Sequence, residues 1–206
     1  MIVSHSLRFI YISNPKTASK SVEAALAVFQ EEPELDEISR EGFFTKRHIP
    51  AWTLREHLPE SVWRSYFKCA FVRNPWDWFV SQHFYNLVNN RDTGDIDRAL
   101  PLSRDDILGT YEYLKQRRGV DWSESGFQHS FVCDDQGVPL VDFVGRFEHL
   151  AADFAHVQTR IGTQVALSRL NTTEHAPYRS YYTDETSFLI YQLYHMDIRI
   201  FGYDFG

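Results

Sequence analysis

The hydrophobic and polar positions near the start of the chain predict a strand, a tight turn and a helix, in that order. Residues 7–12 (LRFIYI) are rich in β-forming side chains, which favours a short strand. The polar run 13–19 then interrupts the pattern. From Ser19 to Gln30 the apolar residues recur at helical spacing, and a Ser or Thr is available as N-cap.

The same order of patterns returns further along the chain. Residues 66–72 are almost continuously apolar, as expected for a parallel strand that is covered on both faces. Arg73-Asn74-Pro75 ends this run, and Pro75 begins a long helix that continues to Leu87. Two strand–turn–helix units predict a parallel α/β sheet whose ligand loops follow the carboxyl ends of the strands.

The rest of the chain predicts further helices and strands but no second domain. We expect helices over 50–58, 104–118, 147–161 (ended by Gly162) and 184–200 (capped by Thr183), strands over 127–133 and 140–144 joined by a turn at 134–137, and loops or short helical turns over 31–41 and 89–97. No segment has the composition of a linker. The prediction is one α/β domain over residues 1–206, with a parallel sheet flanked by helices.

Composition and charge narrow the classes of function. A hydrophobic fraction of 43% suits a globular protein and excludes a disordered one. The formal net charge of −7 disfavours nucleic acid as a partner, so an anion site has to be built from local cations. No basic leader and no apolar run of membrane-spanning length is present, so we expect a soluble, cytoplasmic protein. The sequence leaves the oligomeric state open.

The first polar turn is the strongest candidate for chemistry. A strand that stops just before a helix directs backbone N–H groups and the positive end of the helix toward one point, where a phosphate or sulfate can bind. Lys16, Thr17, Ser19, Lys20 and Ser21 add two ammonium groups and three hydroxyls there. The turn is similar to the phosphate loop of nucleotide-binding enzymes, although Asn14 and Ser19 replace its two glycines. The alternative is an ordinary strand–helix connection with solvated lysines.

The second turn offers a matching cation. Arg73 directly follows a buried strand, and its planar guanidinium suits a dianionic phosphate. Ser81 lies two turns into the helix that Pro75 begins, so its hydroxyl can reach the same anion. The alternative is an arginine that caps its neighbours and a serine that faces solvent.

Both turns resemble those of sulfotransferases that use 3′-phosphoadenosine-5′-phosphosulfate (PAPS). FIYISNPKTASKSVEAAL (9–26) looks like their 5′-phosphosulfate loop, and CAFVRNPWDWFVSQHFY (69–85) looks like their 3′-phosphate strand and helix. LVDFVGRFEHL (140–150) and DIRIFGYDF (197–205) are similar to the carbohydrate sulfotransferases, including those of the heparan 2-O type. The resemblance implies their fold, which is related to the P-loop nucleotide kinases, and a carbohydrate-like acceptor hydroxyl.

The resemblance also implies roles for single residues. Lys16 would stabilise the charge that grows on the bridging oxygen, and no metal would be needed. The residues that would hold PAPS are Lys16, Thr17, Ala18, Ser19, Lys20 and Ser21 at the 5′-phosphosulfate, Arg73 and Ser81 at the 3′-phosphate, and Arg179 in a late loop that closes over the nucleotide. Lys20 departs from the pattern, because the family usually has Thr at this position.

A hydroxyl acceptor needs a general base, and His48 is the candidate. It lies between the two turns in the sequence, flanked by Lys46 and Arg47, and it matches the position of the catalytic His of the heparan 2-O enzymes. The alternative role for His48 is to cap the following helix. His83, two residues after Ser81, is the second candidate.

Several residues keep two interpretations from the sequence alone. Trp76 and Trp78 can stack on a ligand or pack in the core, Gln128 and His129 can line an acceptor cleft, and Cys69 is expected to be a small buried hydrophobe.

Two other functions compete with sulfuryl transfer. A kinase of the same architecture would need a Mg²⁺-holding carboxylate, for which Asp142 is the candidate. A binding protein without catalysis is the other alternative.

Overall fold

The computed structural model describes residues 1–33, 35, 48–89, 101–118, 128–168 and 176–206. These residues form two compact units, each built from two stretches of chain. Unit 1 contains residues 1–73 and 128–172, and unit 2 contains residues 74–127 and 173–206. The predicted loops over 31–41 and 89–97 lie largely outside the described residues, as do Lys46 and Arg47.

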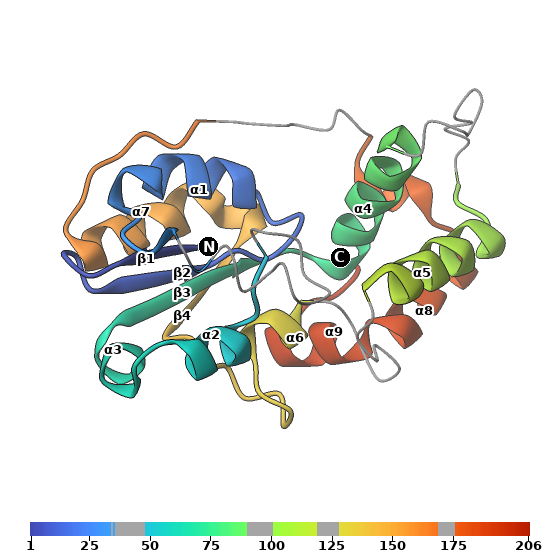
Figure 1. Cartoon of the computed structure of the whole chain (residues 1–206). Coiled ribbons are helices and arrows are strands. Elements are labelled where there is room, and N and C mark those ends of the chain that lie inside the picture. Colours follow the sequence, from blue (N-terminus) through green and yellow to red (C-terminus); the bar gives the residue numbers. More distant parts are fainter. Residues whose placement is uncertain (34, 36–47, 90–100, 119–127, 169–175) are drawn as a thin grey trace. The chain divides into compact units, whose positions relative to one another are not determined.

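Unit 1 is an α/β unit around a four-stranded sheet (Figure 1). The strands lie in the order β1 (Ile2–Ser4), β2 (Phe9–Ile12), β3 (Phe67–Val72), β4 (Phe143–Arg146). β2, β3 and β4 are parallel, which confirms the predicted parallel arrangement. β1 is a strand that the sequence analysis did not predict, and it pairs with β2 in the antiparallel direction.

Helices cover both faces of this sheet. The helices of unit 1 are α1 (Ser19–Leu26), α2 (Ala51–His57), α3 (Glu60–Ser65), α6 (His129–Val132) and α7 (Leu150–Ile161), with 3₁₀ turns η1 (Ala27–Phe29) and η3 (Phe147–His149). In Figure 1, α1 and α7 lie over one face, and α2 and α3 lie on the other. Apolar residues of α1 and α7 form one buried cluster with residues of the strands: Val22, Leu26, Phe154, Val157 and Ile161 with Ile2, Phe9, Tyr11, Cys69 and Phe71. The buried Cys69 confirms its prediction as a core residue.

Unit 2 is helical and rich in aromatic contacts. Its elements are α4 (Pro75–Asn89), α5 (Arg104–Arg118), η4 (Tyr178–Tyr181), α8 (Asp184–Leu193) and α9 (His195–Phe201). Trp78 is fully buried and packs on Tyr194, while the nearly buried Trp76 donates from Nε1 to the Ser187 carbonyl, 2.9 Å away. Both tryptophans therefore pack in the core of their unit.

Several predicted element boundaries were wrong. The expected strand over 127–133 is a turn at Gln128 followed by the short helix α6. The expected strand over 140–144 is β4 at Phe143–Arg146, and Asp142 directly before it accepts a hydrogen bond from Lys68 N–H. The expected helix over 184–200 is broken at the fully buried Tyr194, which separates α8 from α9.

Two predicted helix ends are confirmed. Thr183 caps α8 and forms a capping box with Thr186, and Gly162 ends α7 in the left-handed conformation at φ 75°. In the part of the chain that the structure describes, no helix is long and apolar enough to cross a membrane.

Candidate functional site

The turn after β2 has an unusual backbone. Lys16 and Ala18 both have positive φ angles, 64° and 61°, although neither is a glycine. Such conformations cost about 1–3 kcal/mol each and persist where the surroundings enforce them, often at functional sites. The Thr17 hydroxyl donates to the Asn14 carbonyl at 2.8 Å, and Asn14 Nδ2 donates to the Phe71 carbonyl at 3.1 Å. These bonds hold the turn against the end of β3.

The start of α1 leaves backbone donors at this turn. The first bonds of the helix run from Ser21 N–H and Val22 N–H to the Ala18 carbonyl, and Ala18 provides no side-chain cap. Among the described residues, no acceptor is found for the N–H groups of Thr17 to Lys20. A helix start with such donors and a positive dipole end is suited to an anion.

Lys16 is the half-buried cation of this turn. Burial, together with the positive charges of Arg73 and Lys20, lowers the pKa of Lys16 to about 8, and burial is the largest of the three causes. Burial and like charges both disfavour the protonated form, so a bound anion would stabilise it. The predicted group of cations at this turn is therefore present, and Lys20 is its exposed member.

Contacts with Phe147, Lys16 and Gln128 fix Arg73 beside this turn. Its guanidinium lies over the Phe147 ring, 4.1 Å from the centroid, and Nη1 donates to the Lys16 carbonyl at 3.2 Å. The Gln128 side-chain amide accepts from Arg73 N–H and donates to the Arg73 carbonyl, both at 2.7 Å. Arg73 is only 6% exposed and Gln128 is fully buried. The two predicted turns are thus joined at one edge of the sheet.

The sequence analysis did not predict the contacts that Gln128 and Phe147 make with Arg73. The sequence left open whether Gln128 lines an acceptor cleft, and in the structure its side-chain amide pairs with the N–H and the carbonyl of Arg73. Phe147 was assigned only to a helix. The apolar pattern around both residues gives no signal of these contacts, because they depend on long-range placement.

His48 lies at the same edge. Its Nδ1 is 2.8 Å from the carbonyl oxygen of Ser13, the residue that follows β2. A carbonyl can only accept, so Nδ1 carries the hydrogen and Nε2 is the nitrogen that can take a proton. The second candidate base, His83, is buried in unit 2, where Nδ1 is 2.7 Å from Thr110 Oγ1 and the ring stacks on Phe79. Burial lowers the pKa of His83, whereas Asp106 raises it less strongly.

The remaining predicted residues have the following positions. Ser19 and Ser21 are buried at the start of α1. Ser81 is buried in α4, and Arg179 is exposed in η4, where Nε donates to the Phe205 carbonyl at 3.2 Å. Ser81 and Arg179 belong to unit 2, whereas Lys16, His48 and Arg73 belong to unit 1. The assignment of Ser81 and Arg179 to the same ligand stays a prediction.

Asp142 has a structural role. Its carboxylate lies 2.9 Å from Lys68 Nζ and accepts from Lys68 N–H at 2.8 Å. It precedes β4, so it lies at the opposite end of the parallel strands from the two turns. Within the described ranges, no group of three or more His, Cys, Asp or Glu side chains has the arrangement of a metal site.

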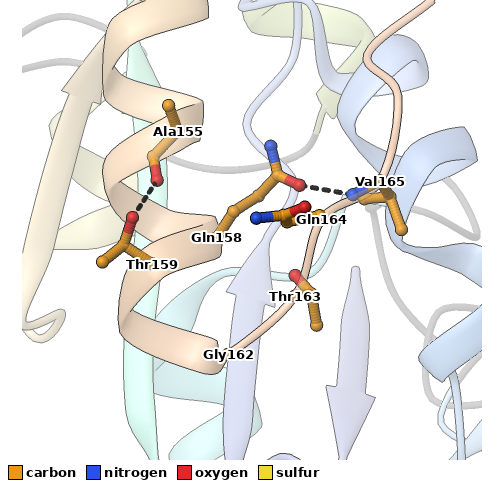
Figure 2. Close-up of a pocket in the computed structure, with 7 residues that line it drawn as sticks. All are labelled: Ala155, Gln158, Thr159, Gly162, Thr163, Gln164 and Val165. Atoms are coloured by element: carbon orange, nitrogen blue, oxygen red, sulfur yellow. Dashed lines mark hydrogen bonds between the residues drawn. The ribbon is translucent and has the colours of Figure 1, made fainter.

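Figure 2 shows a pocket of unit 1 that lies at the end of α7. Gln158 spans it, and its Oε1 accepts from Val165 N–H at 2.5 Å. Because α7 runs back from the end of β4, this pocket is at the edge of the sheet opposite the two turns. None of the predicted site residues lines it.

Comparison with known proteins identifies the family of the chain. The family model described as "Sulfotransferase family" matches residues 1–204, a range that includes all of unit 1 and all but the last two residues of unit 2. An uncharacterised protein of Archaeoglobus fulgidus is 26% identical over 134 residues, which cover 64% of this chain and 98% of that protein. No solved structure matches the chain. Because the family model covers nearly the whole sequence, the chain belongs to the sulfotransferase family.

Proposed function

We propose that the protein transfers a sulfuryl group from PAPS to a hydroxyl of a carbohydrate-like acceptor and releases 3′,5′-ADP. We also propose that residues 1–206 act as one domain, related in fold to the P-loop nucleotide kinases. The observation that carries the proposal is the convergence of Lys16, Arg73 and the start of α1 at one edge of the sheet.

In this proposal the residues at this edge bind PAPS, a ligand with two anionic ends, together with Ser81 and Arg179 of unit 2. The N–H groups of Thr17, Ala18, Ser19 and Lys20, with the Ser19 and Ser21 hydroxyls, would hold the 5′-phosphosulfate. Arg73, held by Gln128 and Phe147, would bind the 3′-phosphate together with Ser81. Arg179 would close over the nucleotide. PAPS supplies an activated sulfuryl group, so little covalent work is left for the protein.

Lys16 and His48 have complementary roles in the proposed reaction. The protonated Lys16 stabilises negative charge on the oxygen that leaves, and the loop amides hold that oxygen in place. His48 accepts the proton of the attacking hydroxyl at Nε2, and the Ser13 carbonyl keeps the imidazole in the required tautomer. No metal is needed in this scheme, because the charges that stabilise the transferred group come from Lys16 and Arg73.

A titration of the full chain with nucleotides tests the choice of ligand. The loss of one charged phosphate contact is worth about 1.5–3 kcal/mol, so 3′,5′-ADP should bind roughly tenfold to a hundredfold more tightly than 5′-AMP. Equal affinity for the two nucleotides would exclude the proposed 3′-phosphate site.

A turnover assay with PAPS separates the competing functions. A sulfotransferase consumes PAPS on a panel of sugars, lipids and phenols. A kinase would instead be stabilised by Mg·ATP, and a binding protein would bind 3′,5′-ADP without turnover. The kinase is disfavoured by the position of Asp142, which pairs with Lys68 at the other end of the sheet.

A further inference from the structure

A second pocket lies wholly within unit 2, and none of the residues proposed to bind PAPS or to act in catalysis lines it. Its volume is about 390 Å³, which falls within the range of small-ligand sites. Trp76 and Phe205 pack edge to face in it, with ring centroids 5.5 Å apart, and the Trp76 indole is held by its bond to Ser187. The pocket is therefore lined in part by rigid aromatic rings.

Two further aromatic rings of this pocket are open to solvent. Phe188 and Tyr191 of α8 are 58% and 47% exposed and both line the pocket. Their rings are nearly parallel, with an interplanar angle of 13° and centroids 6.0 Å apart. Scattered exposed aromatic residues are common, but here two stacked rings line a pocket that also has aromatic walls. The face of an aromatic ring attracts a cationic group of a ligand.

Carboxylates complete the pocket. Asp184 and Asp204 are among its lining residues, and no Lys or Arg is. In the described part of the chain neither carboxylate forms an ion pair, although the Asp204 carbonyl is held by Asn74 Nδ2 at 2.9 Å. Aromatic faces beside unpaired carboxylates favour a cation and repel phosphate, sulfate or an acidic sugar.

We propose that this pocket binds a small organic cation that carries a substituted ammonium group. The ammonium group lies against the Phe188 and Tyr191 rings, and Asp184 and Asp204 supply the opposite charge. This site is independent of the sulfuryl transfer proposed above, because none of the residues that carry that proposal takes part.

Calorimetric titration of the full chain with choline and with its neutral isostere 3,3-dimethyl-1-butanol tests the site. The two probes have the same shape and differ in charge. Choline should bind at least about tenfold more tightly than the alcohol, since the cation–π and carboxylate contacts require the charge. Added salt should weaken the binding of choline and leave that of the alcohol unchanged.

Substitutions of pocket residues test whether choline binds at this site. The double variant Phe188→Leu/Tyr191→Leu should lose about tenfold in choline affinity, and Asp184→Asn/Asp204→Asn should lose a smaller factor. The matched control is Tyr85→Leu, which removes another exposed aromatic ring, one that does not line the pocket. All changed side chains are exposed, and thermal unfolding checks that each variant is folded.

Three results would each overturn the proposal. They are equal affinity for choline and the alcohol, unchanged choline affinity in Phe188→Leu/Tyr191→Leu, and no binding of choline or tetramethylammonium at tens of millimolar. None of these results bears on the binding of 3′,5′-ADP, so this proposal and the proposed function fail separately.

Discussion

Lys16 and Lys68 are two lysines of the sheet unit with opposite surroundings. Lys68 lies near the start of β3, where Nζ donates to the Trp63 and Tyr66 carbonyls and contacts Asp142 at 2.9 Å. Lys16 follows β2, where the nearby charges that affect it are Arg73 and Lys20. The parallel pairing of β2 and β3 puts the two lysines at opposite edges of the sheet.

This difference indicates that Lys68 stabilises the fold, whereas Lys16 is suited to bind an anionic ligand. Lys68 is matched with acceptors from its own chain, so its charge is balanced in the folded protein. Lys16 is half-buried among like charges, which destabilises its protonated form until an anion binds. A fold retains such an arrangement at a functional site more readily than in a core. The comparison predicts opposite effects of removing the two charges.

Removal of the Lys16 charge should have the largest effect on turnover. Lys16→Ala should lower kcat by about a hundredfold to a thousandfold, because the charge it stabilises grows in the transition state. The free energy of unfolding should stay the same or increase, since a repulsion with Arg73 is removed. Steady-state kinetics and urea unfolding measure the two effects. If 3′,5′-ADP affinity falls while kcat is unchanged, the role in leaving-group stabilisation passes to Lys20.

Substitution of His48 tests whether a general base lies at the edge of the sheet that carries the two turns. His48→Ala and His48→Asn should lose at least about a hundredfold in kcat, with near-normal affinity for 3′,5′-ADP. The control is His83→Ala, which removes a buried imidazole of unit 2 and should lose far less activity. If His48→Ala keeps more than about a tenth of the turnover, the histidine is a cap or a packing residue.

Lys68 should show the reverse of Lys16. Lys68→Met keeps the apolar stem but leaves the Trp63 and Tyr66 carbonyls without this donor. We expect a loss of about 1–3 kcal/mol in the free energy of unfolding, and normal kcat per folded molecule. Half of the Asp142 side chain is exposed, so loss of the ion pair itself adds little. A variant with normal stability and reduced kcat would contradict the comparison.

Because the pKa of Lys16 is lowered, the stability of the protein and its affinity for an anionic ligand should depend on pH. Below about pH 8 Lys16 is protonated in both folded and unfolded states, and between about 8 and 10.4 the unfolded state binds more protons. Stability of the ligand-free protein should therefore rise with pH across that window. A bound anion raises the pKa again, so 3′,5′-ADP binding at about pH 8.5 should take up part of a proton.

Calorimetry in two buffers of different ionisation enthalpy measures this uptake. Lys16→Arg keeps the charge without titrating in this range and should abolish the uptake. The nucleotide phosphates are fully ionised at this pH and contribute little. An equal uptake in wild type and Lys16→Arg would assign the proton to another group.

The sequence predicts the strand–turn–helix units well because their patterns are local. The apolar run before Arg73, the Pro at the start of α4 and the Thr183 cap each depend on a few neighbouring residues. The sulfotransferase family follows from the same two turns and is confirmed. Placement of Lys16 and Arg73 at one edge follows from parallel strands, a general rule of such sheets.

The missed features depend on contacts between distant segments. Gln128 lies in an apolar run whose pattern predicts a strand. Its side-chain amide instead accepts a hydrogen bond from the N–H of Arg73, 55 residues earlier in the chain. Tyr194 interrupts a helical pattern because it is buried against Trp78 and Phe79. β1 has only 3 residues, too few to show a period. Pairwise contacts of this kind leave no mark on local periodicity.

Substitution of Lys20 should have the smallest effect on turnover. It tests whether an exposed cation of the turn has the same role as the half-buried Lys16. It is the exposed cation of the turn and the weakest of the three causes that lower the pKa of Lys16. Lys20→Thr, which replaces the ammonium group with a hydroxyl, should raise that pKa and reduce proton uptake at about pH 8.5. Turnover should change by no more than about fivefold, and the difference should shrink as salt screens the exposed charge. Lys20→Gln is the control, because it removes the same charge and keeps a longer polar side chain. A tenfold or larger loss that persists at high salt would mean that Lys20 contacts the bound anion directly and shares the role of Lys16.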